Sequence, residues 1–252
     1  MRVSRVALVA LVAAVCVPSA SAAPKLRLGV FDDVEALQHP ATTFAVLKKL
    51  HVQVARMTLN WSDVATRRPA SPGDPADPAY DWRPYDAAVQ AAARNGVAPL
   101  LTIWGTPAWA NGGRTPNYPP EQMQSLYYFA FAAASRYSGS YIRRNGTQLP
   151  AVRLWLAWNE PNNPVSLSPQ FVRRQGRWAM AAPGTYAKIC TAVYEAVHGA
   201  QEGAEVGCGA TAPRGDDSRV DRPAHPGELG DGRPGAERRR GNDHGKRSAR
   251  LG

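Results

Sequence analysis

The sequence predicts an α/β fold, and more narrowly an incomplete (β/α)8 barrel of about five βα units followed by a disordered C-terminal tail. Three observations lead to this prediction. Apolar runs of strand length alternate with longer segments that repeat apolar residues at helical spacing. Polar and aromatic residues gather where the apolar runs end. The composition changes abruptly near residue 213, before the eight strands of a closed barrel have been reached.

The elements follow one another in chain order as strand, then helix. The first predicted helix carries Phe44 and Leu47 at helical spacing, and the second carries Tyr85 and Val89 and stops at Gly96, a residue typical of helix C-termini. The third is rich in Tyr, Phe and Ala, and the fourth precedes the last apolar run. The predicted strands cover 26–31, 52–61, 97–104, 151–158 and 205–212, and the predicted helices cover 41–52, 82–95, 121–141 and 184–200.

Helices between successive strands favour a parallel sheet with right-handed crossovers. The strands are nearly continuous apolar runs, which is typical of sheets covered on both faces. The turn after the first strand, FDDVEAL, contains no glycine, which disfavours a doubly wound nucleotide-binding sheet. A barrel instead places its chemistry at the C-terminal ends of its strands. The polar and aromatic residues at those ends are Asp32, Asp33, Asn60, Trp61, Trp104, Trp109, Asn159 and Glu160.

Both ends of the chain differ from the predicted domain at 24–213. Residues 1–22 combine a basic start, an apolar run of about 12 residues and small residues before Ala22, which predicts a cleaved signal peptide and a secreted protein without a membrane anchor. The alternative is a buried N-terminal strand or helix. Residues 214–252 contain no aromatic residue and no isoleucine, so we expect a disordered tail. A frameshift or truncation and a natural tail on a smaller domain both explain it.

Charge and cysteine content narrow the function classes. The net charge is +10, but the tail carries both signs and no basic stripe is interleaved with aromatic residues, so nucleic-acid binding is not predicted. After signal cleavage two cysteines remain, Cys190 and Cys208, which either form a disulfide or stay as two buried thiols. No Cys or His cluster has the spacing of a metal site, and the sequence predicts neither a metal nor another cofactor.

Four motifs resemble the glycoside hydrolases of clan A, and most closely family 39 or family 5-like bacterial enzymes. They are RMTLNW (56–61), YDWRPYDAAVQAAARNGVAPLLTIWGTPAWA (80–110), WLAWNEPN (155–162) and, more loosely, VGCGATAP (206–213). The resemblance covers residues 26–213. It implies a (β/α)8 barrel, a retaining mechanism with carboxylates after strands four and seven, and an oligosaccharide, polysaccharide or glycoside as substrate.

The resemblance also implies roles for three residues. Glu160, which follows Asn159, corresponds to the general acid/base of these families. Partial desolvation at the end of an apolar strand favours the protonated form that such an acid needs. Asn159 is expected to bond the sugar 2-hydroxyl, and Arg56 to steady the nucleophile carboxylate. The alternatives are a turn-capping glutamate, an ordinary turn asparagine and an unrelated buried ion pair.

Five further residues are predicted to bind the sugar. Aromatic faces offer apolar area to the C–H face of a pyranose, although large aromatics are also common core residues. Asp33 could accept a sugar hydroxyl or lie in a solvated turn. The predicted substrate-binding residues are Asp33, Trp61, Trp104, Trp109 and Trp158.

The sequence departs from the family pattern at the nucleophile. Glu228 and Glu237 lie in the predicted tail with no strand before either, so neither is assigned this role. A retaining enzyme needs its two carboxyl groups about 5–5.5 Å apart. We therefore expect this chain to be inactive as a hydrolase. The alternative functions are a non-catalytic secreted carbohydrate-binding protein and, less favoured, a protein that binds nucleic acid or a surface through its Arg-rich tail.

Overall fold

The computed structural model describes residues 26–213 of the 252-residue chain. The predicted signal peptide at 1–22 and the predicted tail at 214–252, with Glu228 and Glu237, lie outside the described residues. The helices are α2 (Asp33–Gln38), α3 (Pro40–Lys49), α4 (Trp61–Val64), α5 (Arg83–Asn95), α6 (Met123–Arg136) and α7 (Ala182–Ala200). The strands are β1 (Gly29–Phe31), β2 (Val54–Asn60), β3 (Ala98–Trp104), β4 (Leu154–Ala157), β5 (Phe171–Arg174), β6 (Arg177–Met180) and β7 (Glu205–Gly207).

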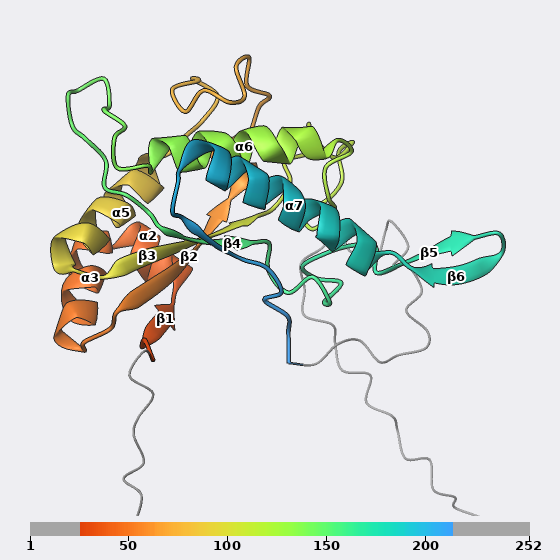
Figure 1. Cartoon of the computed structure of the whole chain (residues 1–252), viewed down its shortest axis with the longest axis horizontal. Coiled ribbons are helices and arrows are strands. Elements are labelled where there is room, and N and C mark those ends of the chain that lie inside the picture. The colour runs from red at the N-terminus through yellow and green to blue at the C-terminus, as the bar shows by residue number, and fades with distance from the viewer. Residues whose placement is uncertain (1–25, 214–252) are drawn as a thin grey trace, which may run out of the picture.

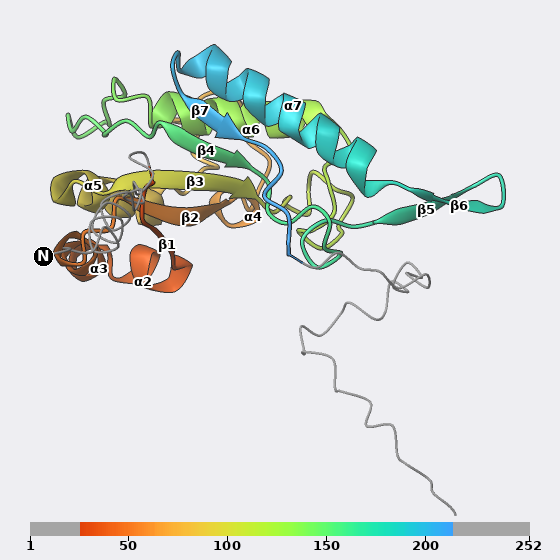
Figure 2. The same cartoon turned by 60° about the horizontal axis from the view of Figure 1, so that its bottom comes forward.

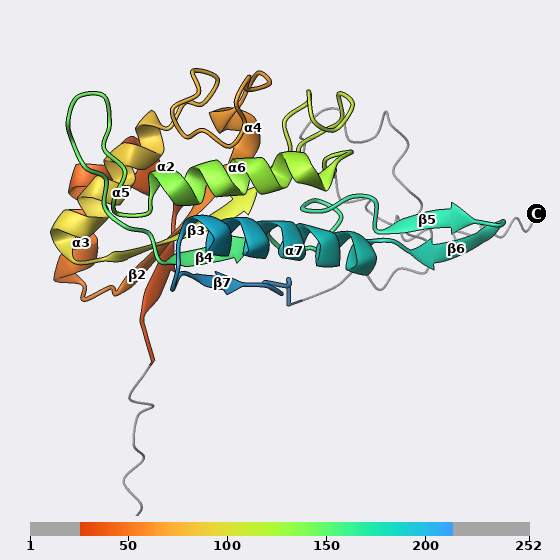
Figure 3. The same ribbon diagram turned by 45° about the horizontal axis from the view of Figure 1, so that its top comes forward.

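Five strands form one parallel sheet in the order β1-β2-β3-β4-β7, which confirms the predicted succession of βα units. Strands β2 and β3 pair over their whole length, from Val54 opposite Ala98 to Asn60 opposite Trp104. Helices α6 and α7 lie side by side over the sheet, with α7 above β4 and β7 (Figures 1 and 3). Turning the molecule shows α2 and α3 beside β1 at the other end of the sheet (Figure 2).

The two faces of the sheet differ in burial. In β2, Ala55, Met57 and Leu59 are fully or almost fully buried, whereas the intervening Arg56 and Thr58 are half-exposed. Because successive strand residues point to opposite faces, the first set packs under the helices and the second lines an open inner face. The expectation of a sheet covered on both faces is therefore wrong for the described residues.

An aromatic cluster joins the start of α5 to α6 on the helix side of the sheet. Trp61 stacks on Phe129 at a centroid distance of 5.3 Å, and Trp82 stacks on the other side at 5.7 Å. Close by, Arg136 makes a bidentate pair with the buried Asp86 at 2.8 and 2.6 Å. Long aromatic side chains and a paired charge thus fix α5 against α6.

Three local differences from the predicted elements stand out. The FDDVEAL segment, predicted as a turn, forms α2, whose N-cap Asp32 accepts the Glu35 N–H at 3.1 Å. The third predicted helix ends at Arg136, five residues short of residue 141. The antiparallel hairpin β5–β6 was not predicted. No helix within residues 26–213 is long and apolar enough to cross a membrane.

Candidate functional site

Arg56 is the centre of a polar cluster on the inner face of the sheet. Its Nε donates to Thr102 Oγ1 of β3 at 2.9 Å, and its Nη2 donates to Asn159 Oδ1, beyond β4, at 2.5 Å. Its guanidinium lies over the Phe31 ring of β1, 4.7 Å from the centroid. One side chain therefore connects four neighbouring strands, because β2 lies between β1 and β3 and the pleat turns Arg56 inward.

The chain after β4 adopts an unusual backbone conformation. Trp158 and Glu160 have positive φ values of 67° and 37°, a region that non-glycine residues seldom occupy. The Glu160 N–H donates to Ala210 O at 2.8 Å, and its Oε2 accepts Asn163 Nδ2 at 3.3 Å. Such strain persists only where surrounding contacts enforce it, and it clusters at functional sites. The half-buried Glu160 therefore occupies a held position.

Charge balances the partial burial of the guanidinium. Desolvation lowers the pKa of Arg56, and the carboxylates of Asp33 and Glu160 act in the opposite direction. Asp33 is itself anchored, since its Oδ1 accepts the Thr58 N–H at 2.6 Å. The cluster thus brings Arg56, Asn159, Glu160 and Asp33 to one edge of the sheet, as the sequence predicted for strand ends.

A groove of about 400 Å³ runs along this edge. Its lining includes Asp33, Asn60, Trp104, Asn159 and Ser166, but Glu160 is not among the lining residues. The polar atoms converge from β2, β3 and the chain after β4, while the Trp104 ring supplies apolar area. A few convergent polar groups beside an aromatic ring are typical of small-ligand sites.

The four predicted tryptophan platforms lie in different environments. Trp61 and Trp158 are both 0% exposed, so neither ring has a face open to a sugar and both assignments are corrected. Trp158 and Trp104 donate through their indole N–H groups to the same acceptor, Ser166 O, at 2.7 and 3.0 Å. Trp109 is half-buried beside Trp61, and its N–H donates to Ala65 O at 2.7 Å. Only Trp104 lines the groove.

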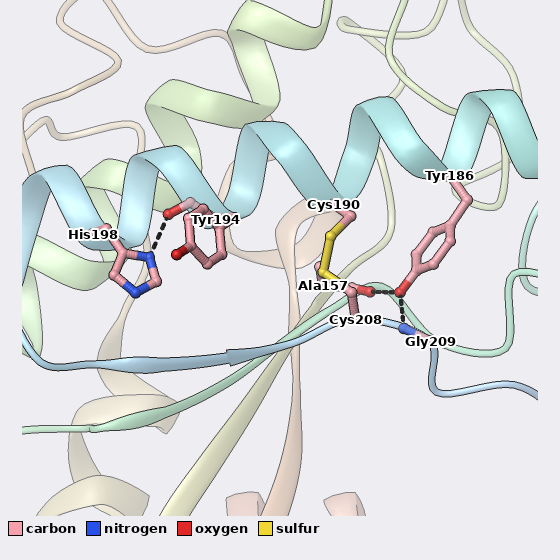
Figure 4. The surroundings of a disulfide bond; sticks show 7 residues. All are labelled: Ala157, Tyr186, Cys190, Tyr194, His198, Cys208 and Gly209. Carbon is pink, nitrogen blue, oxygen red and sulfur yellow. Dashed lines mark hydrogen bonds between the residues drawn. A yellow bond between two sulfur atoms is a disulfide. The ribbon is translucent and has the colours of Figure 1, made fainter.

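Contacts between α7 and the chain after β7 hold the segment that binds the Glu160 backbone, and the sequence did not predict them as part of the site. Tyr186 of α7 donates to Ala157 O at 3.0 Å and accepts the Gly209 N–H at 2.5 Å (Figure 4). One turn further along α7, Cys190 forms a disulfide with Cys208, which resolves the two alternatives left open by the sequence. The chain after β7 is thereby fixed to α7 and delivers Ala210 O to Glu160.

A second contact closes the same junction. Asn162 Nδ2 donates to Ala212 O at 3.1 Å, and Asn162 Oδ1 accepts the Ala212 N–H at 2.8 Å. Burial raises the pKa of Tyr186, so its hydroxyl stays protonated and able to donate. The residues missed by sequence reasoning are Thr102, Ser166, Tyr186 and Asn162. Only Thr102, a lone hydroxyl inside an apolar strand, gave a readable signal.

No group of three or more His, Cys, Asp or Glu side chains within residues 26–213 is placed to hold a metal ion. The side chains of the site supply carboxylate, guanidinium, amide and indole groups. These can exchange a proton, hold an anion and bond hydroxyl groups.

Comparison with known proteins identifies the fold. No family model matches the chain, and no curated protein matches it. A family 39 glycoside hydrolase from Xanthomonas axonopodis pv. citri is 17% identical, with 74% of this chain and 35% of that chain covered and a TM-score of 0.50. A glucosidase from Croceicoccus marinus is 16% identical, with 72% of this chain and 35% of that chain covered and a TM-score of 0.49. A family 39 glycoside hydrolase from Bacteroides cellulosilyticus WH2 is 20% identical, with 73% of this chain and 31% of that chain covered and a TM-score of 0.46.

The chain spans about a third of the length of these solved structures. The similarity to the Xanthomonas structure confirms the predicted α/β fold of TIM-barrel type for the part that is covered.

Proposed function

We propose that the chain is part of an exported glycoside hydrolase in which Glu160 is the general acid/base. The observation that carries this proposal is the Arg56–Asn159 hydrogen bond of 2.5 Å, which ties the residue before Glu160 to the centre of the inner sheet face. Asn159 lines the groove, and its Nδ2, whose one contact among the described residues is to Ser166 Oγ at 3.5 Å, has a second N–H for a sugar hydroxyl. Glu160 lies close enough to Arg56 to act on its charge.

The proposed chemistry is cleavage of a glycosidic bond with retention. Glu160 in its acid form protonates the leaving oxygen, and its carboxylate then takes a proton from the water that releases the sugar. A second carboxylate must attack the anomeric carbon between these steps. Among residues 26–213, the other acid that acts on Arg56 is Asp33, and its Oδ1 already accepts the Thr58 N–H. We therefore infer that residues 26–213 do not complete the reaction unaided.

The incomplete carboxylate pair favours a second candidate function, a secreted protein that binds a glycan without cleaving it. The groove with Trp104, Asn159 and Asp33 is common to both candidates. Export is proposed from the leader-like residues 1–22, and a disulfide between Cys190 and Cys208 suits an oxidising compartment.

Hydrolysis of aryl glycosides by the full chain separates the two candidates. Turnover that disappears in Glu160→Gln but persists in Glu202→Gln, a matched exposed glutamate, supports the hydrolase. Sugar binding without turnover, weakened by Asn159→Ala, supports the binding protein. If neither turnover nor binding is measured for the folded chain, both candidates are wrong.

A further inference from the structure

Hairpin β5–β6 is separate from the main sheet. Its two strands pair only with each other, and the hairpin projects beyond the body of the molecule next to the start of α7 (Figures 1 and 3). A two-stranded hairpin on its own is marginally stable in water. We therefore expect a binding partner to contact the exposed hairpin and stabilise it.

The hairpin carries unbalanced positive charge. Arg174 and Arg177 lie directly opposite each other next to the turn, and Arg173 precedes them. The chain has no Asp or Glu from 161 to 194. Like charges directly opposite each other destabilise a strand pair, and none of the three arginines forms a salt bridge among the described residues. An anion bound between Arg174 and Arg177 would remove the repulsion of this pair.

The opposite face of the hairpin is aromatic and apolar. Residues directly opposite in an antiparallel pair share a face, so Phe171, Arg173, Trp178 and Met180 lie together. Trp178 is 48% and Met180 69% exposed, and the Arg173 guanidinium lies 5.4 Å from the Trp178 ring centroid. The ribbon thus has an indole on one face and an arginine pair on the other.

The base of the hairpin rests on the candidate site. Gln170 Nε2 donates to Pro161 O, the residue after Glu160, at 3.0 Å. Gln170 O accepts the Ala181 N–H at 2.8 Å, so both ends of the hairpin meet beside the acid/base loop. A molecule bound along the hairpin therefore leads toward Glu160.

We propose that hairpin β5–β6 binds a carboxylate-bearing polysaccharide, one that contains uronic acid units. Planar guanidinium groups pair with carboxylates through two parallel hydrogen bonds, and an indole packs against the C–H face of a sugar ring. A polymer can contact both faces of the narrow ribbon. A flat anionic membrane in contact with Trp178 and Met180 would leave Arg174 and Arg177 on the far face. That this glycan is also the substrate rests on the proposed function, whereas the binding itself does not.

Titration of the full chain with an oligogalacturonide tests the proposal. Arg174→Gln/Arg177→Gln should weaken binding by about a hundredfold, since each charge-assisted pair contributes about tenfold or more. The charge-matched control is Arg27→Gln/Arg94→Gln, two exposed arginines outside the hairpin, and it should bind within about twofold of wild type. Arg174→Lys/Arg177→Lys keeps the charge but loses the fork and should be intermediate. If Trp178 packs against the sugar, the oligogalacturonide should quench its fluorescence, and Trp178→Ala should abolish this quenching. Equal melting temperatures establish that each variant is folded.

The outcomes separate this proposal from the proposed function. Oligogalacturonide binding that depends on the hairpin and persists in Glu160→Gln supports the proposal, even where no turnover is measured. Equal weakening in the hairpin variant and its control overturns it, because net charge alone then explains binding. Tighter binding to a sulfated oligosaccharide of equal length, to vesicles with anionic lipid, or to a second copy of the chain also overturns it.

Discussion

Removal of the Cys190–Cys208 disulfide should lower the free energy of unfolding by about 3 kcal/mol. The cysteines are separated by 18 residues in sequence, and the loop-closure entropy that such a crosslink removes from the unfolded chain amounts to about 3 kcal/mol at 25 °C. Replacing both cysteines by serine should therefore shift the urea unfolding curve to lower concentration with little change in slope. Tryptophan fluorescence follows the transition.

The same variant should loosen the support of Glu160 more than the rest of the fold. Strand β7 has only three residues and lies at the edge of the sheet, so the chain at 208–212 depends on the disulfide, Tyr186 and Asn162 for its place. Amide exchange should rise in peptides covering 158–163 and 208–212. Peptides from α5, which packs on α3 and β3 at the other end of the sheet, should serve as the internal control.

Two results would refute this reasoning. One is an unfolding midpoint of the serine variant, and of wild type treated with reductant, that equals the midpoint of untreated wild type. The other is unchanged exchange at 158–163, since the disulfide would then have no part in holding Glu160. Reductant added to the serine variant controls for effects unrelated to the bridge.

Three further predictions concern the scaffold. Arg136→Met leaves Asp86 buried without its bidentate partner and should cost about 3–5 kcal/mol of unfolding free energy; a loss below 1 kcal/mol would contradict it. Arg136→Met/Asp86→Leu should recover only part of this loss, because the Tyr137 hydroxyl and Arg143 also lose Asp86 as a partner. Gly105→Ala should destabilise by about 1–2 kcal/mol or more, because φ is 82° and the new Cβ would meet the Asn60 amide; Gly113→Ala, at φ 80° in open space, should cost less, and equal losses would exclude the clash. Burial raises the pKa of Tyr85 to about 12, whereas an unfolded tyrosine ionises near 10. The contribution of this residue to stability is therefore complete below pH 10 and should fall by about 2 kcal/mol as pH rises to 12; a Tyr85→Phe variant that shows the same fall as wild type in alkaline urea titrations would refute this cause.

Long, regular patterns in the sequence were sufficient for the main elements. Strands β2 and β3 and helix α5 start and end within two residues of their predicted limits, and Gly96 ends α5 in the left-handed conformation. These segments are decided locally, by apolar spacing and by a residue that tolerates positive φ. The parallel order of the sheet followed because helices separate the strands.

Short elements were missed because their signals are local and brief. Helix α2 begins with Asp32 as N-cap and has Glu35 three residues later, a capping-box pattern that is hard to distinguish from a turn in so short a segment. In the hairpin, Gln175 and Gly176 both have positive φ, as a two-residue type I′ turn requires. Gln-Gly is a weaker signal than Asn-Gly, and four-residue strands offer little alternation.

The structure brings most of the polar residues predicted for the site to one edge of the sheet, but not every predicted side chain lies there. Asn60 and Trp61 were grouped as neighbours at a strand end. Asn60 is the last residue of β2 and reaches the groove, whereas Trp61 begins α4 and enters the core against Phe129 of α6. Contacts made across the fold, such as Tyr186 to Ala157, have no signature in a single sequence.

Arg56 shows what the proposed chemistry still needs. Its Nε and Nη2 are occupied by Thr102 and Asn159, while its Nη1 donates no hydrogen bond within residues 26–213. A half-buried cation is stabilised most by a carboxylate that it can reach with two donors, and the burial that lowers the pKa of Arg56 increases the gain from such a partner. A nucleophile carboxylate would use this free nitrogen, and would have to lie about 5–5.5 Å from the Glu160 carboxyl for retention. A glutamate supplied from outside the described residues would therefore both complete the proposed reaction and stabilise Arg56. A complementing segment that carries this glutamate should raise the melting temperature of the chain more than the same segment with glutamine in its place.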